Sequence, residues 1–358
     1  MTRPTPETLL TARLRNLQAY HVADAKGLVK LDAMEVPYPW PPELVEDWTA
    51  RLRETPVNRY PDPAAHGLKA ALRETLSLPT QAALLLGNGS DELIQLLGMA
   101  VTAPGRCLLA PTPSFAMYSL VAAFTGLEFV GVPLRPGDFS LDTGAMLAAM
   151  ARHRPALTFI AYPNNPTGNL FDEAAITALL EAAPGLVVLD EAYFAFAGQS
   201  FVKRLPDYPH LLVMRTLSKV GLAGLRVGFL LGGEQWLNEF EKLRLPYNIN
   251  SLSQCTAEFA LAHWPVLEAN IARIGESREM LGKALRELPD LSVYPSAANF
   301  FLVRTAHGQG DRIHTALRKA GILVKNFGAD PQLHDCLRIT VGTPSENRQL
   351  ISALRAIL

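Results

Sequence analysis

The segment RTLSKVGLAGLRVGF, residues 215–229, places two cations close together with almost no polar residue between them. Lys219 follows Ser218, and Arg226 comes seven residues after the lysine. Two ordinary surface cations are the simplest interpretation, but the glycines of this segment favour tight backbone bends, and its cations and hydroxyls together suit a bound phosphate. A lysine near another cation and partly removed from water has a lowered pKa and becomes a usable amine nucleophile. The segment therefore predicts a nucleophilic lysine beside a phosphate anchor.

An acidic residue ends one of the apolar runs. Asp190 lies near the end of LVVLDE, residues 186–191, and Tyr193 follows three residues later. A buried carboxylate is costly unless it has a partner. It either caps the next turn or pairs with the protonated nitrogen of a pyridine ring, which keeps that ring an electron sink. If Asp190 lies beside the lysine segment, pairing with the ring nitrogen fits. Tyr193 is close enough in the sequence to reach the same site.

Two turns follow apolar runs and could bind the polar groups of such a ligand. In LLLGNGSDELIQLL, residues 84–97, a helix begins at Ser90 and Asp91, and its free backbone N–H groups suit a phosphate. Ser90 alternatively serves only as the N-cap of that helix. In YPNNPTG, residues 162–168, Asn165 lies in a turn after a strand, where an amide could donate to a ring oxygen.

Three further residues are candidates on weaker patterns. Phe115, in APTPSFAMYSL, could stack on a flat ring or pack in the core. Tyr60, in NRYPDP, lies in an extended segment bounded by prolines. Arg338, in CLRIT, lies between apolar neighbours, where an arginine is usually paired or binds a carboxylate or phosphate.

Buried strands must position these groups, because apolar runs alternate with Ala- and Leu-rich helical stretches. Several of the runs are apolar on both faces, as parallel strands covered by helices are. The seven strand candidates are residues 82–87, 106–111, 127–132, 157–162, 186–191, 211–216 and 227–232. The fold class is α/β, with a large domain on a mostly parallel seven-stranded sheet and a smaller α+β domain.

We divide the chain into three parts on this pattern. Residues 1–45 form an N-terminal arm that packs on the small domain, and their prolines predict irregular structure. Residues 46–250 form the large domain, and residues 251–358 form a helical connection and the small C-terminal domain.

The composition excludes several classes of protein. The 358 residues are 49% hydrophobic and carry a net charge of −1, so no global field attracts nucleic acid or a membrane surface. The three cysteines have neither metal-ligand nor disulfide spacing, so we expect no metal and a reducing compartment. The N-terminus lacks the apolar core of a signal peptide, and no apolar run approaches the length of a membrane span. These features predict a cytoplasmic protein.

Taken in order, these motifs resemble the fold-type I aminotransferases that use pyridoxal 5′-phosphate (PLP). The likeness covers nearly the whole chain, and within that group it is closest to the histidinol-phosphate aminotransferases. The segments that carry it are VKLDAMEVPYPWP, NRYPDP, GNGSDE, PSFAMYS, YPNNPTG, DEAYFAF, TLSKVGLAGLRVG and CLRITVGTPSEN.

The resemblance implies a role for each candidate residue. Lys219 bonds to PLP and shuttles the proton between the substrate and the cofactor. Ser218 and Arg226 hold the PLP phosphate, with backbone N–H groups around Ser90 and Asp91. The remaining assignments are Asp190 on the pyridine nitrogen, Asn165 and Tyr193 on the ring oxygen, Phe115 on the ring face, Tyr60 on the cofactor phosphate of a neighbouring subunit in a homodimer, and Tyr20, Lys325 and Arg338 on the substrate.

The resemblance also implies a reaction, with L-histidinol phosphate and 2-oxoglutarate giving imidazole acetol phosphate and L-glutamate in histidine biosynthesis. The family often has arginine where this chain has Lys325 and tyrosine where it has Phe115. The alternatives are a PLP-dependent lyase similar to threonine-phosphate decarboxylase, an aromatic-amino-acid aminotransferase, and a PLP-binding regulatory protein. The intact lysine and aspartate argue against the regulatory protein.

Overall fold

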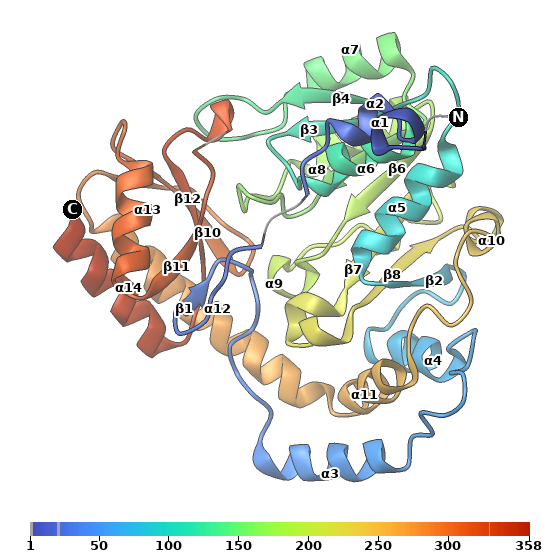
Figure 1. Ribbon diagram of the computed structural model, residues 1–358, viewed down its shortest axis with the longest axis horizontal. Helices are drawn as coiled ribbons and strands as arrows, with labels where there is room; N and C mark the ends of the chain where they lie inside the picture. The colour runs from blue at the N-terminus through green and yellow to red at the C-terminus, as the bar shows by residue number, and fades with distance from the viewer. Residues whose placement is uncertain (1–2, 20–21, 329) are drawn as a thin grey trace.

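The structure, a computed structural model, describes residues 3–19, 22–328 and 330–358, and it contains two β-sheets (Figure 1). The larger sheet has seven strands in the order β2-β8-β7-β6-β5-β3-β4. Its strands are β2 (Ala83–Asn88), β3 (Cys107–Thr112), β4 (Glu128–Pro133), β5 (Leu157–Ala161), β6 (Leu186–Asp190), β7 (Leu211–Thr216) and β8 (Val227–Gly232). β8 is the one strand that runs antiparallel to the rest of this sheet, so the predicted mostly parallel seven-stranded sheet is confirmed.

Helices cover both faces of this sheet, which explains why its strands are apolar on both sides. Successive residues of β2 show the alternation: Leu84 and Leu86 join one hydrophobic cluster, whereas Leu85 joins the other. One face is covered by α5 (Ser90–Val101), α6 (Met117–Thr125) and α10 (Glu234–Glu241). The other is covered by α4 (His66–Thr75), α7 (Thr143–His153), α8 (Glu173–Ala182) and α11 (Ser251–Ala262).

The smaller sheet has five strands in the order β1-β11-β12-β10-β9 and its own hydrophobic cluster. Its strands are β1 (Val29–Leu31), β9 (Leu291–Val293), β10 (Phe300–Thr305), β11 (Ile322–Asn326) and β12 (Cys336–Thr340). The helices that pack on it are α12 (Trp264–Arg286), α13 (Gly310–Lys319) and α14 (Pro344–Ile357). In Figure 1, α12 runs from this smaller unit towards α11 beneath the larger sheet.

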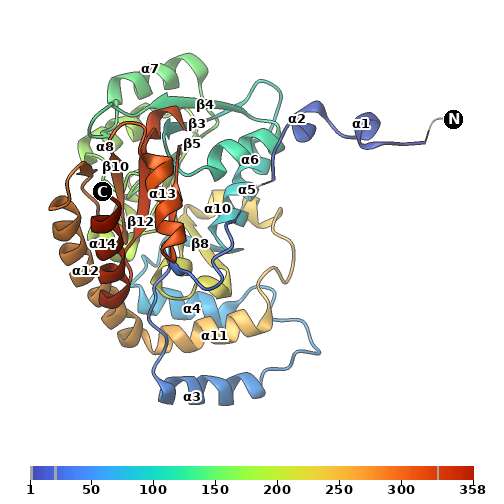
Figure 2. The same cartoon turned by 60° about the vertical axis from the view of Figure 1, so that its left-hand side comes forward.

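The N-terminal segment is more regular than its prolines predict. It contains the short helices α1 (Pro6–Leu9) and α2 (Ala12–Arg15), and β1 pairs in parallel with β11 at the edge of the smaller sheet. In Figure 2, α1 and α2 project from the body of the molecule. Between these elements, residues 3–5, 16–19, 22–28 and 32–41 have turns or irregular structure, and the last of these stretches leads into α3 (Pro42–Arg53). The domain boundaries at residues 45 and 250 stay predictions.

Candidate active site

A cavity with an empty volume of about 550 Å³ lies where the C-terminal ends of β5, β6 and β7 meet the N-terminus of α5. Loops after the carboxyl ends of parallel strands are the usual place for ligand sites in such sheets. The residues that line it are Met34, Ser90, Asp91, Phe115, Ala161, Pro163, Asn165, Asp190, Ala192, Tyr193, Thr216, Ser218, Lys219 and Arg226. All the predicted cofactor-binding residues except Tyr60 are therefore brought together.

Lys219 enters this cavity from the 3-10 helix η2 (Leu217–Val220), which follows β7 directly. Its Nζ donates a hydrogen bond to the backbone oxygen of Ala33, at 3.1 Å. Burial, together with the charge of Arg338, lowers the pKa of the Lys219 amine to about 8. Arg226, the cation expected from the sequence to have this effect, contributes less than either. The amine is thus partly neutral near physiological pH, as a nucleophile must be.

One end of the cavity carries donors for an anion. Arg226 Nη1 donates to Ser218 Oγ at 3.2 Å, and Arg226 Nη2 forms an ion pair with Asp91 Oδ2 at 3.1 Å. The backbone N–H groups at the start of α5 face the same space. The turn depends on glycine, because Gly89 has a φ of +78°, a backbone conformation that other residues rarely adopt. Gly89, rather than Ser90, is the N-cap of α5, so that part of the prediction is wrong.

At another wall of the cavity, Asp190 presents a carboxylate that is only 4% exposed. Its Oδ1 accepts from the backbone N–H of Ala192 at 3.0 Å, as the turn-capping interpretation expects. Its Oδ2 accepts from the hydroxyl of Tyr118 at 2.7 Å. Burial raises the pKa of Asp190 to about 6, while these two hydrogen bonds oppose that rise. The carboxylate is therefore oriented by two donors and ready for a further cationic partner.

Arg338 connects the cavity to the N-terminal segment. Its Nη1 donates to Asn165 Oδ1, and its Nη2 donates to the backbone oxygen of Asp32 at 2.7 Å. Lys325 is the cross-strand neighbour of Arg338 between β11 and β12. Both basic residues line a second, larger cavity that shares Ser218, Lys219 and Arg226 with the first. The predicted substrate-binding cations thus lie beside the predicted nucleophile.

Two predicted residues lie outside this cluster. Tyr60 is 79% exposed and stacks on Tyr247 with ring centroids 4.3 Å apart, away from both cavities. Its role in a neighbouring subunit stays a prediction. Tyr20 lies outside the described residues.

Sequence reasoning missed two groups that complete the site. Tyr118 is buried in α6 and contacts Asp190, and a hydroxyl-bearing ring inside the otherwise apolar run MYSLVAAF was the available signal. The segment 32–35 closes the other side, where Met34 has its N–H bonded to Thr340 Oγ1 and its oxygen bonded to Asn299 Nδ2. Nothing in the sequence marks these backbone contacts.

The donor set of the cavity fits PLP. A buried carboxylate suits the ring nitrogen, the cation and helix N-terminus suit the phosphate, and the lysine suits the aldehyde carbon. Among the described residues, no cluster of His, Cys, Asp and Glu is placed to bind a metal ion. No helix in the described part of the chain is long and apolar enough to cross a bilayer.

Known proteins are similar to this chain in sequence and in fold. Residues 26–354 match the family model for aminotransferases of class I and II. The chain is 54% identical to histidinol-phosphate aminotransferase 2 of Nitrosococcus oceani over 99% of both chains, and 48% identical to the histidinol-phosphate aminotransferase of Chromobacterium violaceum over 98% of both.

A crystal structure of histidinol-phosphate aminotransferase from Sinorhizobium meliloti, in complex with PLP, superposes with a TM-score of 0.87. It is 26% identical and covers 98% of this chain and 97% of its own. The chain therefore belongs to the class I and II aminotransferases, among the histidinol-phosphate aminotransferases, and is a PLP-dependent enzyme.

Proposed function

We propose that this enzyme transfers the amino group of L-histidinol phosphate to 2-oxoglutarate, giving imidazole acetol phosphate and L-glutamate. The observation that carries the proposal is the convergence of Lys219, Asp190 and the Arg226 anion site on one cavity, with Lys325 and Arg338 on the adjoining one. The names of relatives about half identical over nearly the full chain support the same substrate.

PLP supplies an electrophilic aldehyde and a conjugated ring that accepts the electron pair left when a substrate Cα–H bond breaks. Lys219 Nζ would hold the cofactor through its amine, and the same amine would accept and return the proton of the substrate Cα. Its lowered pKa suits both tasks, because the neutral amine is the nucleophile and the base. Asp190 holds the protonated ring nitrogen, and Tyr118 orients that carboxylate.

The other residues orient the cofactor. Arg226, Ser218 and the N-terminus of α5 around Ser90 and Asp91 bind its phosphate. Because Oδ1 of Asn165 accepts from Arg338, the Nδ2 group is the end of this amide that would donate to the ring oxygen. Tyr193 would donate a hydrogen bond to the same ring oxygen, and Phe115 would stack on one face of the cofactor ring.

The substrate cations must serve two different anions in turn, since histidinol phosphate carries a phosphate and glutamate carries carboxylates. The guanidinium of Arg338 forks onto either group, and Lys325 adds a point charge. We place Tyr20 near them on the sequence resemblance alone.

We further propose a cytoplasmic homodimer in which Tyr60 reaches the PLP phosphate of the partner subunit. The ring of Tyr60 is solvent-exposed, and Tyr247 holds it from one side, as a residue that completes a neighbouring site requires. The three cysteines are free thiols, which suits a reducing compartment.

Steady-state kinetics with 2-oxoglutarate test the substrate assignment. The proposal predicts a much larger kcat/KM for L-histidinol phosphate than for L-histidinol or L-phenylalanine. Equal use of the three donors would replace it with the aromatic aminotransferase. Release of CO₂ from L-threonine phosphate without amino transfer would replace it with the decarboxylase.

A further inference from the structure

The larger cavity extends beyond Lys219 to a wall of which the proposed mechanism uses only Lys325. It has an empty volume of about 1,820 Å³, and one side is formed by α13 and β11. The residues of that side are His314, Arg318, Leu323, Val324, Lys325 and Asn326. None of them lines the smaller cavity, so this wall faces the part of a substrate that extends away from the cofactor.

The wall carries three basic side chains. His314 and Arg318 are four residues apart on α13, so they share one helix face, and Lys325 lies on the adjoining strand. Burial lowers the pKa of His314, and the charges of Arg318 and Lys325 lower it further, which reflects their proximity. Asp311 and a hydrogen bond to the backbone of Val324 act in the opposite direction.

Acidic residues also border this cavity, but two of the three are already paired. Glu35 forms an ion pair with Lys30 at 2.7 Å, and Asp91 pairs with Arg226 at 3.1 Å. The third, Asp32, lies near Arg338, which donates to its backbone oxygen. None of the three acidic residues belongs to the side formed by α13 and β11, whose lining residues are basic, polar or apolar.

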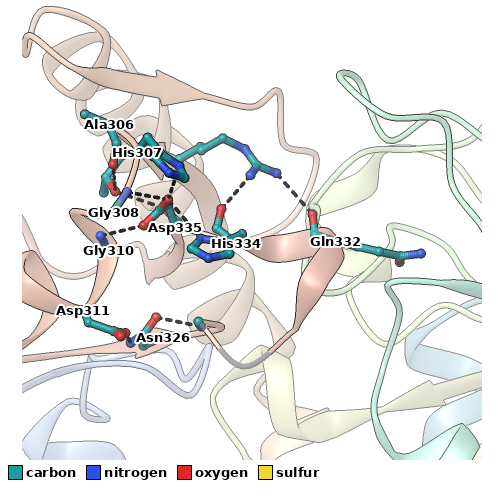
Figure 3. Close-up of polar contacts among 12 residues, drawn as sticks. Ala306, His307, Gly308, Gly310, Asp311, Asn326, Gln332, His334 and Asp335 are labelled. Atoms are coloured by element: carbon teal, nitrogen blue, oxygen red, sulfur yellow. Dashed lines mark hydrogen bonds and ion pairs between the residues drawn. The ribbon is translucent and has the colours of Figure 1, made fainter.

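Hydrogen bonds fix α13 relative to the strands that carry the other cations (Figure 3). Asp335, directly before β12, accepts from the backbone N–H groups of Gly308 and Gly310 at 2.9 and 3.0 Å, at the start of α13. Next to Lys325, Asn326 Nδ2 donates to Asp311 Oδ1 at 2.6 Å. These contacts hold the N-terminal end of α13 against the end of β11 and the start of β12, so the helix that carries His314 and Arg318 is positioned before a ligand arrives.

The side chain of Arg318 is accessible to a ligand. Its side chain is exposed, and its Nη2 donates to the backbone oxygen of Asp24 at 3.2 Å. A phosphate offers several acceptor oxygens, and a guanidinium can take two of them, whereas Lys325 contributes only a compact point charge. Arg318 would therefore supply the two parallel N–H donors that a lysine at position 325 lacks.

We propose that Arg318 and His314 are specificity-determining residues, which join Lys325 in binding the phosphomonoester end of the amino substrate. The inference rests on the proposed function and extends it, since it adds two residues of the α13 wall to Lys325 and Arg338 as partners of the phosphate. Arg318 provides two parallel donors, and His314 provides one donor from the same helix face.

The test compares L-histidinol phosphate with L-histidinol, which differ only in the phosphate, in the first half-reaction followed by cofactor absorbance. In Arg318→Gln, the ratio of the two apparent second-order rate constants should fall about ten-fold, mostly through weaker binding, and Arg318→Lys should lie between. His314→Gln should lower the ratio less. The matched control is Arg312→Gln, because Arg312 is on the same helix and donates to the backbone oxygen of Ile357.

Inhibition by inorganic phosphate gives a second measurement, which tests the phosphate subsite without changing the amino substrate. Phosphate should compete with L-histidinol phosphate in the wild type and about ten-fold more weakly in Arg318→Gln. An unchanged substrate ratio in Arg318→Gln, or an equal fall in Arg312→Gln, would overturn this inference while leaving the proposed function intact. A wild-type enzyme that uses both donors equally would instead remove the proposed function and this inference with it.

Discussion

The hydroxyl of Tyr118 donates a 2.7 Å hydrogen bond to Asp190 Oδ2, and both side chains are buried. The Tyr118 ring is itself held by a stacked contact with Phe159, at a centroid distance of 4.6 Å, and an edge contact with Phe115. The carboxylate proposed to hold the cofactor nitrogen is thus oriented by an aromatic cluster on α6 and β5. That arrangement makes Tyr118 a positioning residue for Asp190.

Tyr118→Phe should weaken PLP binding by about 1–2 kcal/mol, because Asp190 loses a donor to its charged form in a buried site. Titration of the apoenzyme with PLP measures this directly. Tyr162→Phe is the matched control, since Tyr162 is equally buried and donates to Gln199 instead. If the control weakens PLP binding as much as Tyr118→Phe does, the orienting role is wrong.

Asp190 should make the stability of the apoenzyme depend on pH. Its pKa is raised from 3.8 to about 6, so the folded chain holds the proton more tightly than the unfolded chain does. The stabilisation is full below about pH 4 and is lost as the pH rises through about 6, a difference of about 3 kcal/mol at about 1.36 kcal/mol per pKa unit.

Asp190→Asn removes this titration. Urea unfolding of both apoproteins at pH 4 and pH 7 should show the variant gaining stability relative to the wild type at the higher pH, by up to about 3 kcal/mol. A constant difference between the two proteins at both pH values would mean that the carboxylate titrates normally.

A buried ion pair lies next to the candidate active site. Glu191 is 0% exposed and accepts from Arg215 Nε and Nη2 at 3.0 and 2.9 Å, and it also accepts from Ser200 and the backbone of Phe201. Because Glu191 follows Asp190 and Arg215 precedes the lysine turn, the pair links the ends of β6 and β7.

Arg215→Met should lower the free energy of unfolding by about 3–5 kcal/mol, because it leaves a buried carboxylate without its cation. Adding Glu191→Gln should restore part of that loss. Arg204→Met is the control, since its partners Glu173 and Asp207 are exposed, and it should cost less than about 1 kcal/mol. Equal losses in the two arginine variants would show that burial does not decide the effect.

The sequence predicted the elements better than their contacts. All seven strands of the larger sheet were visible as apolar runs, because burial on both faces leaves a continuous signal. The edge strand β1 was missed, since three residues are too few to show a period. The bonds Tyr118–Asp190 and Arg338–Asn165 join residues 72 and 173 positions apart, and such pairs are set by tertiary packing that local patterns do not encode.

The proposed dimer predicts complementation between two impaired subunits. In a mixed dimer of Lys219→Ala and Tyr60→Phe chains, one site would carry both substitutions and the other would carry neither. Mixing the two variants under subunit exchange should therefore recover part of the activity. A monomer with full activity in light scattering, or no recovery despite proven exchange, would contradict the shared site.

The bond between Lys219 and PLP is the centre of this account, and borohydride reduction followed by peptide mapping tests it most directly. We expect one modified peptide that contains Lys219. Capture of PLP by the apoenzyme should become faster as the pH rises through about 8, where burial and Arg338 have shifted the pKa of this amine. A label on any other lysine, such as Lys325 on the wall of the adjoining cavity, would contradict the account.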